Sequence, residues 1–366
     1  MKLSSLQVFW LMFTFETGNI ILLTINPVMK DAKQDVWIAY LIASVLGVLI
    51  VYIAVKTALL YPRQTLIIFS KRILGKWLGS VIVLFYLVQW YAVVGNILSE
   101  FADFTITVLL PTSPPWALFL SMLLLIVYVT FIGGIEGIGR CCEVFGPISI
   151  FSVFILIIFS SKDFNALNLL PVFTDTGMVP IIKGALTPLA FLGESVIMLM
   201  LVSFTEKPDK ALKSAVWGIL LAAINVTIVA VCVLLVFGPE ISAKLRHPSF
   251  DIVSYISIMD FIQNLEIIAV LVWILSVFIK LSLYFFLASY GTAQLFNVKN
   301  WRKLIWINAI FFFCLVMLVP GTSYSFGYMK TYWVYYVLPI NMAGIPLLLL
   351  FIGSIRKKRA ASSPGH

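Results

Sequence analysis

The stretch Phe191-Leu192-Gly193-Glu194-Ser195 lies inside a long apolar segment between residues 179 and 204. A carboxylate in the middle of a membrane span costs about 2.5–3.5 kcal/mol unless it faces protein or water. Glu194 stands between a glycine and a serine, and Pro188 lies less than two helical turns before it. This combination predicts a span made of two half-helices with an unwound joint between them.

A similar polar interruption, Glu16-Thr17-Gly18-Asn19, lies in the first apolar segment. Interrupted spans at corresponding positions in the two halves of a membrane protein point to a binding site near the midplane. We therefore expect the ligand-binding residues of the two joints to be Glu16, Thr17, Gly18, Asn19, Phe191, Gly193, Glu194 and Ser195.

The two predicted joints have complementary electrostatics. A half-helix that begins near Gly18 would point free N–H groups at a carboxylate, whereas the carbonyl groups beside Glu194 would suit an ammonium group. An α-amino acid carries both charges, so we hypothesise that the two joints bind one together. In the alternative interpretation, Thr17 and Glu194 only cap half-helices and bind no ligand.

The composition indicates a polytopic membrane protein. Of the 366 residues, 61% are apolar and 11% are charged, and the mean hydropathy is +1.06. A soluble protein carries about 25% charged residues. The net charge of +9 arises mainly from short basic loops, which membrane topology explains without a nucleic-acid partner.

Apolar runs of about 20 residues, the length that crosses a bilayer, recur along the whole chain. They predict ten transmembrane helices, at residues 6–27, 36–55, 78–99, 116–135, 144–160, 179–204, 214–237, 265–289, 303–320 and 332–353. The fold class is therefore all-α. We expect a single transmembrane domain over residues 1–355, followed by a cytoplasmic tail at residues 356–366.

Most of the 25 Lys and Arg residues fall in one set of alternate loops, which places both termini in the cytoplasm. Breaks in the first and sixth spans divide the ten into two halves, at residues 6–160 and 179–353. An odd number of spans in each half inverts the second half relative to the first. The sequence thus predicts a five-plus-five inverted repeat with broken helices 1 and 6.

Three further residues are candidates for the site. Tyr91 in the third span is an aromatic candidate for a pocket lining, although tyrosine also fills cores. Glu266 and Lys280 in the eighth span are candidates for ion or proton coupling or gating. They lie about 21 Å apart along a helix and cannot pair with each other. Lys280 is expected to face a polar cavity or an acidic partner, Glu16 or Glu194, or else to extend to the cytoplasmic surface.

The sequence contains no P-loop, no nucleophile motif and no set of metal ligands. We therefore expect no catalytic residues, no metal and no cofactor, and the chain is not expected to be an enzyme. The four cysteines have no metal-type spacing and imply no disulfide framework.

Several motifs in a fixed order resemble one known family. They are Tyr61-Pro62 before Leu74-Gly75-Lys76-Trp77-Leu78-Gly79; Arg140 followed by Glu143, Phe145 and Pro147; Phe191-Leu192-Gly193-Glu194; and Glu266 with Val272-Trp273-Ile274. Over its whole length the chain resembles the B subunit of endospore germinant receptors. This spore permease family belongs to the amino acid–polyamine–organocation superfamily.

The resemblance implies a receptor subunit in the inner membrane of the dormant spore, beside an A subunit and a lipoprotein C subunit. It implies recognition of a small nutrient germinant, often an amino acid or a sugar, that triggers germination. Glu16 departs from the small or apolar residues usual at the first joint. A bound carboxylate would therefore be repelled there unless Glu16 is protonated or paired with Lys280.

Two other functions fit the same sequence. A proton- or sodium-coupled amino-acid transporter would use Glu16, Glu194 and Lys280 as coupling groups. A channel subunit would conduct ions or water while another subunit binds the ligand. The fold alone does not choose between a sensor and a carrier.

Overall fold

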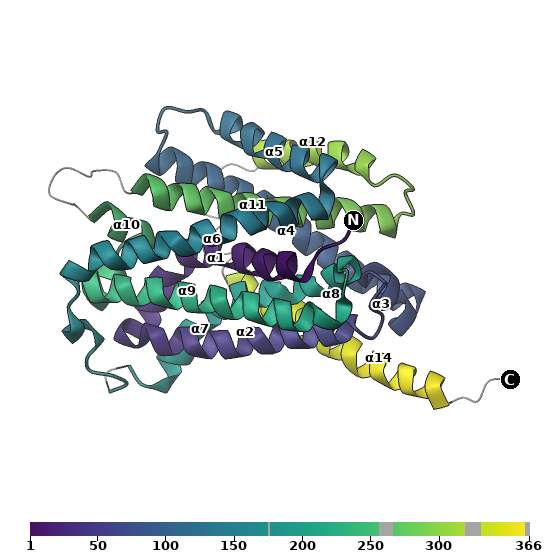
Figure 1. The fold of residues 1–366 in the computed structure, drawn as a ribbon, viewed down its shortest axis with the longest axis horizontal. Helices are drawn as coiled ribbons and strands as arrows, with labels where there is room; N and C mark the ends of the chain where they lie inside the picture. The colour runs from purple at the N-terminus through teal and green to yellow at the C-terminus, as the bar shows by residue number, and fades with distance from the viewer. Residues whose placement is uncertain (175, 256–265, 319–330, 363–366) are drawn as a thin grey trace.

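The computed structural model describes residues 1–174, 176–255, 266–318 and 331–362, and these residues are almost entirely helical. Eight continuous helical stretches within them are long and apolar enough to cross a membrane, and one of these, Ser5–Ala58, contains two successive helices. The predicted class, an all-α polytopic membrane protein, is confirmed. The axes of most of the long helices are roughly parallel, and the start of α1 and the end of α14 lie at one end of the bundle (Figure 1). We call the opposite end, which carries α10, the distal end.

The first part of the chain forms six helices. They are α1 (Ser5–Ala32), α2 (Val36–Ala58), α3 (Leu66–Leu74), α4 (Lys76–Val108), α5 (Pro115–Ile132) and α6 (Gly134–Ser160). Three short 3₁₀ turns occupy connections, at Lys33–Asp35, Ser161–Asp163 and Ala166–Leu169. A capping box starts α1, because Ser4 accepts from the Gln7 backbone N–H while the Gln7 side chain accepts from the Ser4 backbone.

The second part includes a segment of mixed helix type. It is α7 (Met178–Leu192), the 3₁₀ helix η4 (Gly193–Ile197), α8 (Met198–Leu201) and the 3₁₀ turn η5 (Val202–Phe204). The remaining elements are α9 (Pro208–Ser242), α10 (Pro248–Tyr255), α11 (Glu266–Leu295), α12 (Arg302–Leu318), the π-helix η6 (Trp333–Gly344) and α14 (Ile345–Ser362). Because α14 extends to Ser362, much of the segment predicted as a tail is helical.

The predicted break in the first span is wrong. Helix α1 is continuous through Glu16-Thr17-Gly18-Asn19, so no half-helix begins at Gly18. Thr17 donates its hydroxyl proton to the Phe13 carbonyl, 2.6 Å away, within the same helix. A Cβ atom on Gly18 would collide with Ser276 of α11. The glycine therefore allows close packing of two helices rather than a bend in one.

The predicted joint in the sixth span coincides with a change of helix type. The α-helix ends at Leu192, and the chain continues as 3₁₀ helix from Gly193 to Ile197. The joint is therefore tightened rather than unwound. A Cβ atom on Gly193 would lie 2.7 Å from the sulfur of Met342 in η6, so the glycine also lets the joint pack closely against the π-helix.

Three segments form the buried centre of the bundle. Residues 11–20 of α1, residues 192–202 of the sixth span and residues 279–289 of α11 are buried without interruption. Helix α1 packs against α6, α7, α9 and α11. The three segments that the sequence analysis singled out for their charged residues are thus among the most enclosed.

The N-terminal residues attach to the end of the sixth span. The Leu3 backbone N–H donates to the Phe204 carbonyl at 2.7 Å, and the Glu206 N–H donates to the Leu3 carbonyl at 2.9 Å. Leu3 is fully buried. The start of the chain is therefore fixed to η5 by a short parallel bridge to Thr205.

Gly218 tests the contact between α9 and α1. A Cβ atom there would lie 2.5 Å from the Phe9 carbonyl oxygen and 2.9 Å from the Met12 Cβ. We predict that Gly218→Ala destabilises the protein by about 1–3 kcal/mol, the usual cost of overpacking, measured by thermal unfolding in detergent. The control is Gly137→Ala, whose Cβ would lie 3.6 Å from the nearest atom. Equal melting temperatures for the two variants would contradict this packing.

Candidate functional site

An ion pair lies in the centre of the bundle. The Lys280 Nζ atom of α11 is 2.9 Å from the Glu194 Oε2 atom of η4, and the two side chains are 1% and 3% exposed. The contact is close, although its angles are not those of a directed hydrogen bond. Of the alternatives for Lys280, the structure shows the acidic partner rather than extension to the surface.

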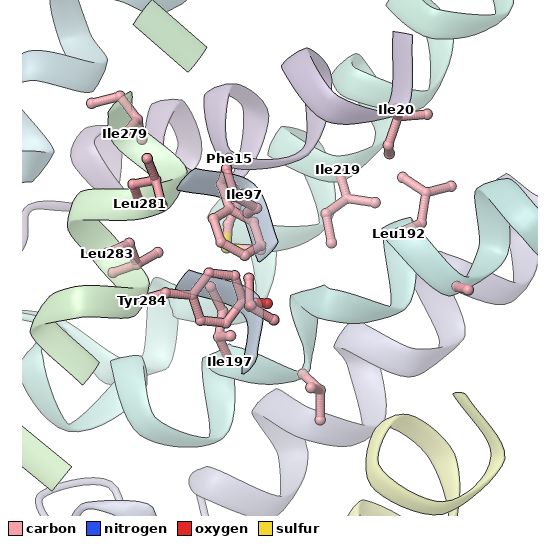
Figure 2. Packing of buried hydrophobic residues seen from close by; sticks show 14 of the residues in the cluster. Phe15, Ile20, Ile97, Leu192, Ile197, Ile219, Ile279, Leu281, Leu283 and Tyr284 are labelled. Carbon is pink, nitrogen blue, oxygen red and sulfur yellow. The ribbon is translucent and has the colours of Figure 1, made fainter. Parts of the chain in front are cut away.

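Aromatic side chains complete the surroundings of this pair. Tyr284, one helical turn beyond Lys280, donates its hydroxyl proton to the same Glu194 oxygen at 2.6 Å. The ring of Tyr284 packs against Phe15 of α1 with centroids 5.4 Å apart (Figure 2). Lys280 also lies over the rings of Phe15 and Phe191, at 5.0 and 5.4 Å. Such cation–π contacts offset part of the cost of removing the ammonium group from water.

Glu16 is a second carboxylate beside the same lysine. It is fully buried, and neither of its oxygens has a hydrogen-bond partner among the described residues. Lys280 lies over the ring of Phe15, the residue next to Glu16 in α1. The centre therefore contains two carboxylates and one ammonium group. Fully ionised, these three groups carry one excess negative charge in a water-poor interior.

The other predicted joint residues lie on different sides of this centre. Thr17 and Gly18 line a cavity of about 90 Å³ between α1, α6 and α11, which we call the side cavity. Asn19 lines a different cavity, and its Oδ1 atom is buried without a partner among the described residues. Gly193 packs against η6, and the Ser195 hydroxyl is likewise buried and unpaired in the described structure.

Tyr91 is not brought to the joints. Its hydroxyl donates to Asn308 of α12 at 2.8 Å and lies 3.1 Å from the Thr292 hydroxyl of α11. Its ring packs against Phe312 of α12. Tyr91 thus connects α4, α11 and α12, and it lines neither the side cavity nor the cavity that Asn19 lines. The Glu266 side chain lies outside the part of the chain that the structure describes.

Asn19 faces a cavity of about 60 Å³, which we call the central cavity. Its polar and aromatic lining residues come from α1, α4, the sixth span and η6, and they are Asn19, Asn96, Glu100, Thr187, Phe191, Glu194 and Trp333. Both predicted joints therefore contribute to one cavity. None of the described lining residues is a lysine or an arginine, so the cavity has an acidic lining.

A larger cavity of about 440 Å³, which we call the vestibule, lies next to the central cavity. The two share Leu23, Asn96 and Glu100 as lining residues. The vestibule also reaches the loop after α9, where Arg246 pairs with Asp103 at 2.6 Å. Both members of this pair are partly exposed. The shared lining indicates a route from the distal surface to Glu100 and then to the central cavity.

Sequence reasoning missed Tyr284 and Glu100. Tyr284 follows Lys280 by four residues and so shares its helix face, which is a signal the sequence offers. Glu100 lies one residue beyond the predicted end of the third span at residue 99. The apolar run that begins at Phe101 continues the helix to Val108, and this continuation places Glu100 inside it.

The arrangement of helices defines the class of protein: an integral membrane protein with a transporter fold. One solved structure, MhsT in complex with L-phenylalanine, superimposes with a TM-score of 0.62 at 13% identity, over 97% of this chain and 89% of that one. Another, the nucleobase-cation-symport-1 family transporter Mhp1 with bromovinylhydantoin bound, gives 0.59 at 12% identity, over 98% and 91%. At such identities the likeness shows the fold alone.

The chain belongs to the spore permease family, described as spore germination protein, whose family model matches residues 2–322. It is 27% identical to spore germination protein YndE of Bacillus subtilis, over 92% of each chain. It is 28% identical to spore germination protein XB of Bacillus anthracis, over 94% of this chain and 96% of that one. The family and the fold are those of permeases or transporters rather than enzymes.

Substitutions of the two members of the central ion pair should destabilise the protein by different amounts. Lys280→Met would leave Glu16 and Glu194 buried without a cation, and breaking a buried pair in this way costs about 3–5 kcal/mol. Glu194→Gln leaves Lys280 beside Glu16, so we predict a smaller loss. The double variant should recover part of the loss caused by Lys280→Met. Thermal unfolding of the purified variants measures the three values, and a loss for Glu194→Gln as large as that for Lys280→Met would contradict the shared-lysine arrangement.

His247, which lines the vestibule, should make the stability of the protein depend on pH. Burial, and secondarily the charge of Arg246, lowers the pKa of His247 from 6.5 to about 4, and its ring packs edge-on against Phe104. Between these two pH values the unfolded chain binds a proton that the folded chain does not. We predict that the melting temperature falls as the pH is lowered from 6.5 to 4, and that His247→Gln weakens this dependence. The same pH dependence in both proteins would contradict the buried neutral state.

Proposed function

We propose that this protein is a membrane subunit of a spore germinant receptor, and that it senses a small nutrient, an amino acid in the first instance, to trigger germination. Membership of the spore permease family supports the process. The transporter fold supports ligand binding at the centre of the bundle. The observation that carries the proposal is the central cavity, which joins α1 to the 3₁₀ joint of the sixth span.

The finer architecture belongs to the same proposal. Ten spans in a five-plus-five inverted repeat would place α1 and the sixth span in corresponding positions. Both termini would be cytoplasmic, so the distal end would be the outer side of the spore inner membrane. A and C receptor subunits would be the partners. The start of α1 and the end of α14 lie at the same end of the bundle (Figure 1), which agrees with an even number of spans.

Signalling would follow from a change in the packing of the buried centre. A ligand shifts a conformational equilibrium only by its difference in affinity for the two states. A ligand in the central cavity would contact η4 next to the Lys280–Glu194 pair and η6 at Trp333. Binding there would favour one arrangement of the sixth span over another, and the partner subunits would respond to that change.

The test is germination of spores that carry the chain as the sole copy of this subunit. We predict that Glu194→Gln reduces ion release and the fall in optical density at least ten-fold after a panel of amino acids and sugars is added. The matched control is Glu136→Gln, since Glu136 forms only an exposed pair with Arg140 and such pairs contribute little. A normal response from Glu194→Gln spores that contain wild-type amounts of the protein would contradict the proposal.

A coupled transporter is the second candidate. It is favoured by the central pair itself, because a lysine and two carboxylates in one enclosure can exchange protons as a carrier changes state. Uptake of labelled ligand into proteoliposomes separates the two functions. Accumulation against a gradient would identify a transporter, whereas saturable binding without accumulation would identify a sensor.

A further inference from the structure

Glu100 differs from the other carboxylates of the site in its position. It lies on α4, at the boundary where the vestibule meets the central cavity, and it lines both. Its Oε1 atom is buried and has no hydrogen-bond partner among the described residues. The residue as a whole is half-buried. A buried acceptor oxygen without a partner is costly, so a donor group that pairs with the Glu100 Oε1 atom would bind favourably.

The second carboxylate of the central cavity already has its partners. Glu194 accepts from Tyr284 and contacts Lys280, both through its Oε2 atom. An incoming cation would therefore have to compete with the buried Lys280 ammonium group for Glu194. At Glu100 no such competitor is in contact among the described residues. Of the two carboxylates that line the cavity, Glu194 is thus paired with a lysine and Glu100 is not, among the described residues.

Two further buried polar atoms belong to residues that line the central cavity. The Asn19 Oδ1 atom of α1 and the Trp333 Nε1 atom of η6 are buried without partners in the described structure, and both residues line the central cavity. Asn19 and Trp333 are 3% and 8% exposed. Unpaired polar atoms from two further helices indicate a cavity built to receive hydrogen bonds as well as charge.

The size and charge of the two cavities restrict the ligand further. The central cavity, about 60 Å³, is well below the roughly 300–1,000 Å³ of pockets for drug-sized molecules. The vestibule is wider and carries Lys30, Lys244 and Arg246, of which Arg246 is paired with Asp103 of the same lining. An acidic inner cavity behind a basic opening favours a small molecule whose cationic end points inward and whose anionic end points outward.

We propose that Glu100 binds the ammonium group of a small primary amine that enters through the vestibule, with Asn19 and Trp333 beside it as hydrogen-bonding groups. This inference rests on the proposed function and gives its ligand a chemical class. It also differs from the hypothesis drawn from the sequence, in which the sixth-span joint with Glu194 received the ammonium group. Glu194, which lines the same cavity, remains paired with Lys280.

The experiment measures binding to the purified full-length protein in nanodiscs. The probes are methylammonium, ethanolamine and the small amino acids, each compared with the isostere in which a hydroxyl group replaces the amine, such as lactate for alanine. We expect at least one amine to bind the wild-type protein ten-fold or more tightly than its hydroxyl isostere. If no amine shows this preference, the proposal is wrong.

Three variants locate the preference. Glu100→Gln should abolish the discrimination between amine and hydroxyl isostere, and Glu100→Asp, which keeps the charge, should retain part of it. Glu240→Gln, an exposed carboxylate on the same distal end and outside both cavities, should bind as the wild type does. Full discrimination by folded Glu100→Gln would overturn the assignment, as would discrimination lost by Glu240→Gln to the same extent as by Glu100→Gln.

The binding result and the germination result are independent. If the amine preference depends on Glu100 but Glu100→Gln does not affect germination, the result would support this site and reject the sensor function. Germination that depends on the protein, in the absence of any amine preference, would support the sensor function and reject this site. Should Glu100→Gln fail to fold, Glu100→Asp still tests the proposal, because shortening the carboxylate should weaken amine binding and leave hydroxyl isosteres unaffected.

Discussion

The contact between Lys280 and Glu194 is the constraint on which the rest of the structure depends. An ammonium group and a carboxylate buried among apolar helices are each costly alone, and removing one partner of such a pair leaves the other charge uncompensated. Their pairing fixes α11 against the 3₁₀ joint of the sixth span. Tyr284 and Phe15 fill the space around the pair, and Gly18 lets α1 approach α11 closely enough to close it.

The class of fold was readable from the sequence because the apolar runs have the length of a bilayer and the basic loops alternate. The joint at Gly193 was also readable, since Gly-Glu-Ser interrupts an apolar run that would otherwise form one regular helix. Gly18 was not, because a glycine permits both a break and a close helix contact. The deciding atom belongs to Ser276, far away in the sequence.

The candidate site was predictable in part for the same reason. A charged residue stands out in an apolar span, so Glu16, Glu194 and Lys280 were found. The sequence does not show that Lys280 pairs with Glu194 while Glu16 lies nearby, because this grouping depends on tertiary packing. Tyr91 is a pocket candidate by sequence, but its hydroxyl contacts Thr292 of α11, 201 residues away in the chain. A sequence pattern does not show such a contact between helices. Glu100 was hidden because hydropathy marks the ends of spans poorly.

The buried centre has a consequence for the order of synthesis. Ribosomes deliver the chain from its N-terminus, so Glu16 and Glu194 are synthesised before Lys280. The partner of both carboxylates arrives only with α11. Leu3 likewise has no backbone partner until Phe204 and Glu206 have emerged. The early spans therefore cannot make all their native contacts at first. The native packing around α1 forms only when the second half of the chain is present.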